Sequence, residues 1–171
     1  MIRHAKPSEI EKIITITQAC AAHMRARGIF QWNDQYPSVA AFREDLRRNE
    51  LYVLEDDSSI VGCITISTKK DLEYEEIVWL TAEGIHNYIH RLAVHPAHQG
   101  SGNARSLMDF AEKLATHNGA RSVRLDTFSR NERNQRFYRN RGYRQLDAIY
   151  FPNQSPYPFY CFEKVLHYNE S

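Results

Sequence analysis

Residues 88–114 read YIHRLAVHPAHQGSGNARSLMDFAEKL, and their apolar period changes in the middle. Residues 88–94 carry β-branched, aromatic and aliphatic side chains on both alternating faces, which predicts a strand covered on both sides, and Pro96 ends it. From Ala104 onward apolar residues recur every three or four positions, which predicts a helix packed on a sheet. The stretch therefore predicts a strand, a turn containing Gly100 and Gly102, and a helix.

The turn at residues 99–104, QGSGNA, favours anion binding. Gly100 and Gly102 can adopt positive φ, so that backbone N–H groups converge on a bound oxygen. The next helix adds N–H groups without intrahelical partners and the positive end of its dipole, which suits a pyrophosphate. The spacing differs from a Walker loop and from a dinucleotide fingerprint. A plain connection between strand and helix is the alternative.

Two segments resemble a known family. LAVHPAHQGSGNA is similar to motif A of the Gcn5-related N-acetyltransferases (GNAT), whose signature is Gln/Arg-x-x-Gly-x-Gly/Ala. Residues 131–143 are similar to the family's Asn-x6-Tyr-x3-Gly-Phe/Tyr motif. The matching residues are Gln99, Gly102, Ala104, Asn131, Tyr138, Gly142 and Tyr143. The resemblance extends over roughly the whole chain at the level of element order.

The resemblance implies an α/β (α+β) fold with a mixed, mostly antiparallel central sheet of about seven strands flanked by about four helices. A length of 171 residues with 42% hydrophobic composition also predicts one globular domain, over residues 1–171. The implied activity is an acyltransferase that moves the acetyl group of acetyl-CoA to a primary amine of a small molecule or peptide, by direct attack in a ternary complex. A non-catalytic acyl-CoA-binding module is the alternative.

Composition narrows the range of partners. The 22 basic and 21 acidic residues give a net charge of +1, which provides no general attraction to nucleic acid or to a membrane surface. One helix is expected to carry a stripe of arginines, which is interpreted as a solvated face. Nucleic-acid binding through this stripe is the alternative. The stripe is Arg130, Arg133, Arg136 and Arg139. No apolar run approaches the ~20 residues of a membrane span, so a cytoplasmic protein is expected. The sequence does not predict the oligomeric state, and a homodimer is compatible with it.

No metal site is expected. The three cysteines, Cys20, Cys63 and Cys161, are widely separated and form no CxxC pair, which indicates buried thiols rather than a zinc site or a disulfide framework.

The resemblance also implies the cofactor site. In the family the motif A strand binds the pantetheine arm and polarises the thioester carbonyl through a backbone N–H, which corresponds here to residues 92–94. The residues expected to bind acetyl-CoA are Leu92, Ala93, Val94, Gln99, Gly100, Ser101, Gly102, Asn103, Ala104, Asn131 and Asn134. Tyr138 stands at the position of the family's general acid toward the coenzyme A sulfur. A phenol with a pKa of about 10 is protonated at neutral pH and can donate that proton to a thiolate.

His90 is the expected general base, because imidazole accepts a proton near neutral pH. The run HRLAVHP is similar to the arylalkylamine acetyltransferases, in which a histidine at this position is one of two strand histidines that assist deprotonation. This chain has Tyr88 at the other position. Asp126, or Glu83 acting through water, is the alternative base.

Residues 29–37, IFQWNDQYP, place aromatic residues among amides without a regular period. In the family this region borders the acceptor site, so Trp32 and Tyr36 are expected to bind substrate. The alternative is that Phe30 and Trp32 pack against the core.

The remaining sequence predicts scaffold. A helix is expected from about Pro7 to Arg27, and a second one capped by Ser38, with Phe42 inward and charges including Asp45 outward. Residues 51–54 and 60–67 predict a hairpin, and residues 143–151 and 159–165 predict the closing strands. Residues 69–76 are charged and predict a solvated connection, with attraction of a cationic amine as the alternative.

Overall fold

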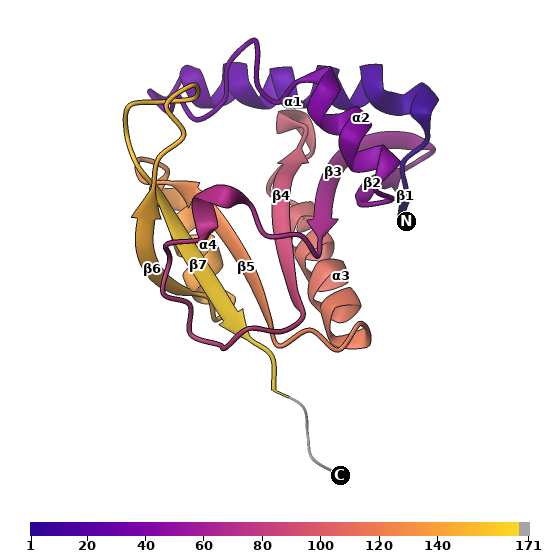
Figure 1. Ribbon diagram of the computed structural model, residues 1–171. Coiled ribbons are helices and arrows are strands. Elements are labelled where there is room, and N and C mark those ends of the chain that lie inside the picture. Colours follow the sequence, from indigo (N-terminus) through magenta and orange to yellow (C-terminus); the bar gives the residue numbers. More distant parts are fainter. Residues whose placement is uncertain (168–171) are drawn as a thin grey trace. The chain divides into compact units, whose positions relative to one another are not determined.

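The computed structural model describes residues 1–167, in which seven strands form one mixed sheet accompanied by four α-helices (Figure 1). The strands are β1 (Ile2–His4), β2 (Leu51–Asp56), β3 (Ser59–Ser67), β4 (His86–Val94), β5 (Ser122–Phe128), β6 (Arg144–Ile149) and β7 (Phe159–Val165). The helices are α1 (Ile10–Arg25), α2 (Val39–Arg47), α3 (Asn103–His117) and α4 (Glu132–Asn140). Single 3-10 turns are η1 (Pro7–Glu9), η2 (Leu72–Tyr74) and η3 (Pro96–His98). The predicted α/β fold is confirmed.

The strand order is β1-β2-β3-β4-β5-β7-β6. Strand β4 runs parallel to β5, with His86 opposite Ser122 and Tyr88 opposite Arg124. The pairs β1–β2, β2–β3, β5–β7 and β6–β7 are antiparallel. The sheet is therefore mixed.

The chain divides into two compact units, which are described separately. Unit 1 comprises Met1–Ile66 and His90–Ala111, and unit 2 comprises Ser67–Ile89 and the chain from Glu112 onward. Both β4 and α3 contribute residues to each unit. The single domain over residues 1–171 stays a prediction.

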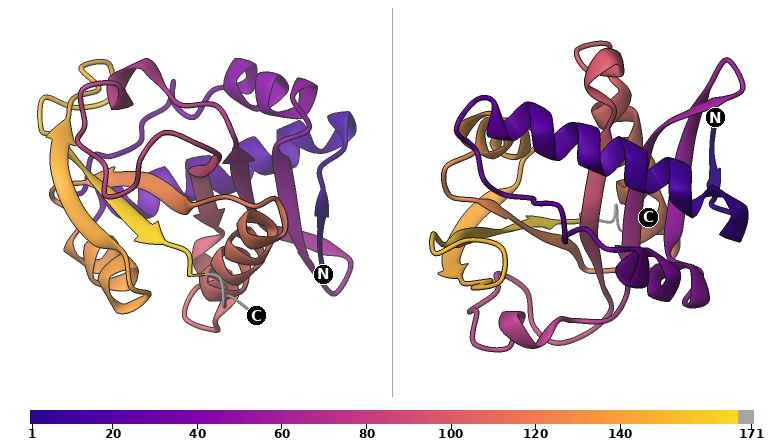
Figure 2. Two further views of the ribbon diagram at one scale, coloured as in Figure 1. Left: turned by 60° about the horizontal axis from the view of Figure 1, so that its bottom comes forward. Right: turned by 90° about the horizontal axis from the view of Figure 1, so that it is seen from above.

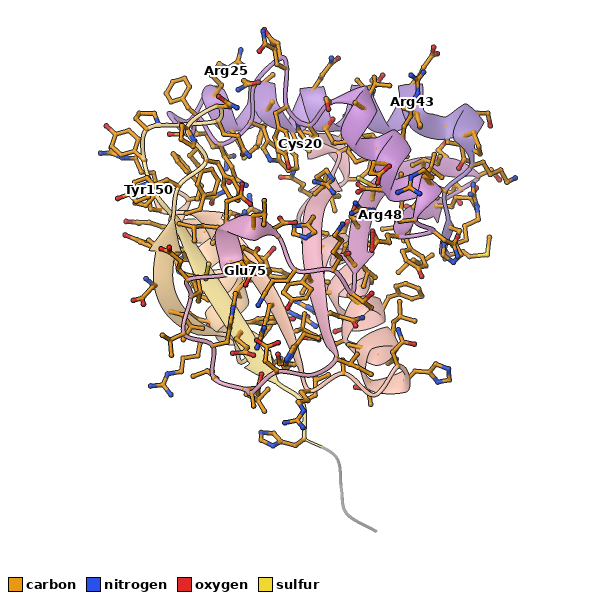
Figure 3. The ribbon with its side chains drawn as sticks, in the orientation of Figure 1. Cys20, Arg25, Arg43, Arg48, Glu75 and Tyr150 are labelled. Carbon is orange, nitrogen blue, oxygen red and sulfur yellow. The ribbon has the colours of Figure 1, made fainter. Side chains whose placement is uncertain are left out.

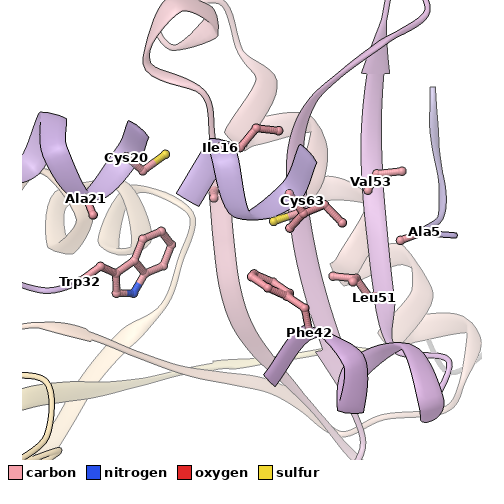
Figure 4. Packing of buried hydrophobic residues seen from close by; sticks show 11 residues of the cluster. Ala5, Ile16, Cys20, Ala21, Trp32, Phe42, Leu51, Val53 and Cys63 are labelled. Carbon is pink, nitrogen blue, oxygen red and sulfur yellow. The ribbon is translucent and has the colours of Figure 1, made fainter. Parts of the chain in front are cut away.

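In unit 1, α1 and α2 pack on the same face of β2 and β3. Ile16 of α1 and Phe42 of α2 are fully buried against Val53 and Cys63 of these strands (Figure 4). On the opposite face, Tyr52 contacts Phe110 of α3 edge to face, with the ring centroids 5.0 Å apart. Unit 1 therefore has helices on both faces of its strands, which gives it a core of its own.

In unit 2, α4 covers one face of β5, β6 and β7, and the segment 67–85 crosses the other (Figures 1 and 2). Tyr138 of α4 packs on Phe162 of β7, with ring centroids 6.1 Å apart. On the other face the backbone N–H of Leu80 donates to Glu163 of β7. Adjacent residues 162 and 163 thus serve opposite faces, as the period of a strand requires.

A fully satisfied carboxylate lies inside unit 2. Glu163 is 0% exposed. Its Oε1 accepts from the backbone N–H of Leu80 at 2.5 Å, and its Oε2 accepts from Thr81 Oγ1 at 2.6 Å, Ser122 Oγ at 2.5 Å and Arg124 Nε at 2.9 Å. Burial raises the pKa of Glu163, but these hydrogen bonds outweigh burial and leave the pKa below its ordinary value. The buried charge is therefore stable as an anion.

Arg124 extends this network to β4 and to the segment 67–85. Its Nη1 donates to Tyr88 Oη at 3.1 Å, and its guanidinium carbon lies 4.4 Å from the centroid of the Trp79 ring. His86 joins the network through Ser122 Oγ, 2.9 Å from its Nδ1. The start of β4 is therefore tied to β5 by side chains as well as by strand pairing.

Three expectations about the scaffold need correction. Arg43 and Arg48 are exposed on α2 as expected (Figure 3), but Asp45 between them is buried, because it pairs with Arg91. Strand β4 begins at His86 rather than at Tyr88, because residues 86 and 87 pair with β5. Residues 69–76 are not all solvated, since Tyr74 is fully buried.

Replacing Phe42 by Ala tests the core of unit 1. Phe42 is fully buried, so the Phe42→Ala substitution is expected to lower the free energy of unfolding by about 3–5 kcal/mol, measured by urea denaturation. Phe30→Ala is the control. Phe30 is 56% exposed, and we expect its loss to change the same quantity by less than about 0.5 kcal/mol. Equal effects of the two substitutions would contradict the packing in Figure 4.

Replacing Glu163 by Gln tests the buried network of unit 2. The substitution leaves the buried Arg124 without its anion, so we expect a loss of about 3–5 kcal/mol of unfolding free energy at pH 7. Because the folded-state pKa of Glu163 lies below its ordinary value, ionisation stabilises the fold above about pH 4.3 and this gain disappears as pH falls through the folded-state pKa. The difference between wild type and variant should therefore shrink in acid. The exposed Glu73 provides the control, Glu73→Gln, for which no difference is expected at either pH.

Candidate functional site

The turn between β4 and α3, in unit 1, has the backbone that the glycine spacing predicts. Gly100 and Gly102 have φ values of +82° and +87°. A Cβ atom built at either position meets no other atom within 4 Å, so the space beside both residues is open. Asn103 begins α3 directly after this turn, and its side chain donates to the carbonyl of His98 at 2.9 Å. The helix start and two left-handed glycines together form an open group of backbone donors.

The end of β4 is fastened to this turn. Gln99 Nε2 donates to the carbonyl of Val94 at 2.8 Å, and the Cys20 thiol of α1 donates to the same carbonyl at 3.1 Å. Ala93 and Val94 are buried, whereas Leu92 and Ala104 are half-buried. Unit 1 thus brings the predicted strand edge, residues 92–94, together with the predicted anion-binding turn.

His90 is buried in unit 1, which changes its chemistry. Burial, and secondly the positive charge of Arg91, lower the pKa of His90 to about 3. The imidazole is therefore neutral at physiological pH, and its protonated form is unfavourable there. Tyr88, which stands at the second histidine position of the arylalkylamine acetyltransferases, accepts a hydrogen bond from Arg124 in unit 2.

The aromatic loop, residues 29–37, has one buried and one half-buried aromatic ring among its predicted site residues. Trp32 is 8% exposed and belongs to the core of unit 1 (Figure 4). Tyr36 is half-buried, and its hydroxyl accepts from Arg91 Nη1 at 3.2 Å. Asn33 Oδ1 accepts from the backbone N–H groups of Gln35 and Tyr36, which folds the loop into a turn.

Helix α4 places the remaining predicted residues in unit 2. Asn131 caps the helix, and its Oδ1 accepts from the backbone N–H of Asn134 at 3.1 Å. Tyr138, two turns further on, is buried against Tyr143 and Phe162. Burial and, secondly, the negative charge of Asp126 raise the pKa of Tyr138, so its hydroxyl is protonated at neutral pH.

Asp126 lies on the face of β5 that the segment 67–85 crosses. It is only half-buried, although β5 is an interior strand. Tyr74 of η2 is fully buried, and its hydroxyl donates to Asp126 Oδ2 at 2.5 Å. Burial, and then the charge of Asp126, raise the pKa of Tyr74, which keeps this donor protonated. Unit 2 therefore contains a carboxylate, Asp126, that is oriented by Tyr74. It also contains a second protonated phenol, Tyr138, whose pKa is raised in part by the charge of Asp126.

Two residues in these arrangements were missed by sequence reasoning. Asp45 follows Phe42 by three positions and therefore lies on the buried stripe of α2, a signal that its charge concealed. Tyr74 is the aromatic residue among the mostly charged residues 69–76, and this contrast is the only signal in the sequence for its burial. Their partners, Arg91 and Asp126, are 46 and 52 residues away along the chain, a distance at which local patterns carry no information.

Other kinds of site are not evident in the part of the chain that is described. Within residues 1–167 no group of three or more His, Cys, Asp and Glu side chains could hold a metal ion. None of the helices in this part of the chain combines the length and the apolar character needed to cross a membrane.

Solved structures share the fold. A GNAT family acetyltransferase from Streptococcus agalactiae 2603 is 20% identical, covers 98% of this chain and 96% of its own, and superposes with a TM-score of 0.82. A Staphylococcus aureus Mu50 protein, provisionally assigned as an acetyltransferase, is 26% identical over 98% of this chain and 99% of its own, with a TM-score of 0.76. PaiA N-acetyltransferase from Thermoplasma acidophilum, solved in complex with coenzyme A, is 18% identical over 97% and 98% of the two chains, with a TM-score of 0.72.

The family is identified from the sequence itself. None of the curated proteins matches the chain. The sequence pattern of the Acetyltransferase (GNAT) family matches residues 12–143, which include β4, the glycine turn, α3, β5 and α4. Because this match covers most of the chain, the protein belongs to the GNAT acetyltransferase family.

Proposed function

We propose that the protein is an N-acetyltransferase that moves the acetyl group of acetyl-CoA to a primary amine of a small molecule or peptide, by direct attack in a ternary complex. The observation that carries this proposal is the turn before α3, where two left-handed glycines with open space beside them lead into a helix start. Such a turn suits the pyrophosphate of coenzyme A. The complex of PaiA N-acetyltransferase with coenzyme A, on the same fold, supports the choice of ligand. A cytoplasmic location and a homodimer stay predictions.

The residues of the turn fit the cofactor, because side chains at positions 100 and 102 would occupy the open space. We assign the pyrophosphate to the backbone of the turn and the pantetheine arm to the edge of β4. The assigned residues are Leu92, Ala93, Val94, Gln99, Gly100, Ser101, Gly102, Asn103 and Ala104, with Asn131 and Asn134 from α4. When bound, acetyl-CoA supplies an acetyl thioester that a free amine attacks, with coenzyme A as the leaving group.

An amine attacks only after losing its proton, so the chain must supply an acceptor for that proton. Burial makes His90 a weak acceptor, because its conjugate acid has a pKa of about 3. Glu83 is 94% exposed in its side chain and lies 3.7 Å from the ammonium of Lys70. Asp126 is half-buried and oriented by Tyr74, so it can hold an ammonium group and then take its proton. We therefore favour Asp126 over His90 and Glu83 as the base.

Tyr138 is the proposed acid, because burial keeps its phenol protonated at neutral pH. The charge of Asp126 raises the pKa of Tyr138. A proton that reaches Asp126 removes this charge, which makes Tyr138 a stronger acid. For the acceptor amine, Tyr36 is the proposed contact, and Trp32 supports the same loop from the core.

Calorimetric titration with acetyl-CoA tests the cofactor site. Gly102→Ala is expected to weaken binding by about tenfold or more, because a methyl group enters the open turn and positive φ disfavours alanine. Gly28→Ala is a matched control, since Gly28 has φ +76° and equally open surroundings but lies after α1. It should leave binding unchanged. Absence of acetyl-CoA binding by the wild type would overturn the proposed function.

Thiol release from acetyl-CoA should then be measured with aromatic amines, polyamines, aminoglycosides, amino acids and N-terminal peptides. Turnover with one class would identify the acceptor. Tight binding without turnover for every class would favour the non-catalytic acyl-CoA-binding module.

Steady-state kinetics of three variants test the roles of acid and base. Tyr138→Phe is expected to lower kcat about 100-fold with unchanged acetyl-CoA affinity, because only the donated proton is lost. Asp126→Asn should lower kcat by a similar factor, and His90→Gln by much less. Tyr150→Phe, at an exposed tyrosine (Figure 3), is the control and should have no effect. A larger loss from His90→Gln than from Asp126→Asn would reverse the assignment of the base.

A further inference from the structure

A buried ion pair joins α2 to β4 within unit 1. Arg91 Nη2 and Nε donate to the two oxygens of Asp45, at 2.6 Å and 2.7 Å, in a bidentate arrangement. Asp45 is 3% exposed, and its Oδ2 also accepts from Thr65 Oγ1 at 2.8 Å. Paired charges with additional hydrogen bonds of this kind fix the relative position of the elements that carry them.

Arg91 also has an unusual backbone conformation. Its φ is +49°, in the left-handed region that side chains with a Cβ atom rarely adopt, and it lies inside a strand. Its carbonyl accepts from the Cys63 thiol at 3.5 Å. A conformation of this kind persists only where the surroundings hold it. The clamp by Asp45 is the strongest such restraint on Arg91, and the next residue in the chain is Leu92 of the proposed cofactor-binding edge.

The third branch of the guanidinium reaches the aromatic loop. Arg91 Nη1 donates to Tyr36 Oη at 3.2 Å, at the end of the loop whose Trp32 is packed in the core of unit 1. The Arg91 side chain thus links β4, directly before the proposed cofactor-binding residues 92–94, to helix α2 and to the loop proposed to contact the acceptor. None of these contacts uses the side chains assigned to the chemistry in unit 2.

We propose that Arg91, held by Asp45, is a positioning residue that sets the place of Tyr36 and its loop for binding of the acceptor amine. The acceptor part of this inference rests on the proposed function. The positioning part does not, because it concerns the loop alone. Tyr36→Phe removes the hydroxyl that accepts from Arg91 and keeps the aromatic ring that is proposed to contact the acceptor, whereas Asp45→Asn releases Arg91 and keeps the Tyr36 hydroxyl.

Fluorine NMR measures the position of the loop without any ligand. The chain contains two tryptophans, so protein labelled with 5-fluorotryptophan gives two resonances, Trp32 in the loop and Trp79 in unit 2 as an internal reference. Tyr36→Phe and Asp45→Asn are expected to shift or broaden the Trp32 resonance and to leave that of Trp79 in place. Glu44→Gln is the matched control, because Glu44 forms an exposed ion pair with Arg47 on the same helix, and it should move neither resonance.

Kinetics with the acceptor identified by thiol release measure the consequence. Tyr36→Phe should raise KM for the amine about tenfold, the effect of losing one hydrogen bond to a charged group, with kcat and acetyl-CoA affinity unchanged. In the Asp45→Asn background, Tyr36→Phe should have no further effect, because Arg91 is already released. Additive effects in this double-mutant cycle contradict the proposal.

The NMR and kinetic experiments together distinguish failure of the positioning role from failure of the role in acceptor binding. An unmoved Trp32 resonance in Tyr36→Phe overturns the positioning role, whether or not the enzyme turns over. A shifted Trp32 resonance together with an unchanged KM for the amine overturns the role in acceptor binding. A wild type without turnover removes the proposed function, while the resonance still decides the position of the loop. If Asp45→Asn does not fold, Tyr36→Phe alone carries the test.

Discussion

A charge taken out of water destabilises a protein by several kcal/mol unless an opposite charge and hydrogen bonds accompany it. Such arginine–carboxylate pairs occur in both units of this protein, among them Arg91 with Asp45 in unit 1 and Arg124 with Glu163 in unit 2. In each of these two pairs the arginine lies on a strand, β4 or β5, and the carboxylate comes from a different element. Breaking either pair would leave a buried charge, so these elements stay together. The position of each strand within its unit therefore depends on a buried ion pair as well as on apolar packing.

The two units differ in the kind of chemistry that their residues offer. Unit 1 contributes mainly backbone: left-handed glycines, a helix start and a strand edge, which are the features proposed to bind the cofactor. Unit 2 contributes titratable side chains, among them Asp126, Tyr74 and Tyr138. Because Tyr74 and Tyr138 both respond to the charge of Asp126, the protonation of one group changes the acidity of the others.

Much of the fold could be predicted because its signals are local. Examples are the glycine turn, the cap at Ser38, the hairpin that ends at Ser67 and the period of α3. Each of these depends on residues that are close together in the sequence. Asp45 and Tyr74 could not be placed in this way. The helical period puts Asp45 on the buried stripe of α2, but its charge predicts exposure, and its burial depends on Arg91, which lies 46 residues away along the chain. Local patterns do not identify the distant partner in a pairing of this kind, so the burial of such a charge could not be predicted.

Residue type is a poor guide to the base for the same reason. A histidine in a strand is the natural candidate because its ordinary pKa lies near neutral pH. Its environment reverses that preference, since burial and Arg91 lower the pKa of His90 to about 3. Asp126, an ordinary carboxylate in sequence, is favoured as the proposed base because it is half-buried and accepts from the buried phenol of Tyr74. The functional assignment of both residues therefore depends on which face of its strand each one occupies and on what covers that face.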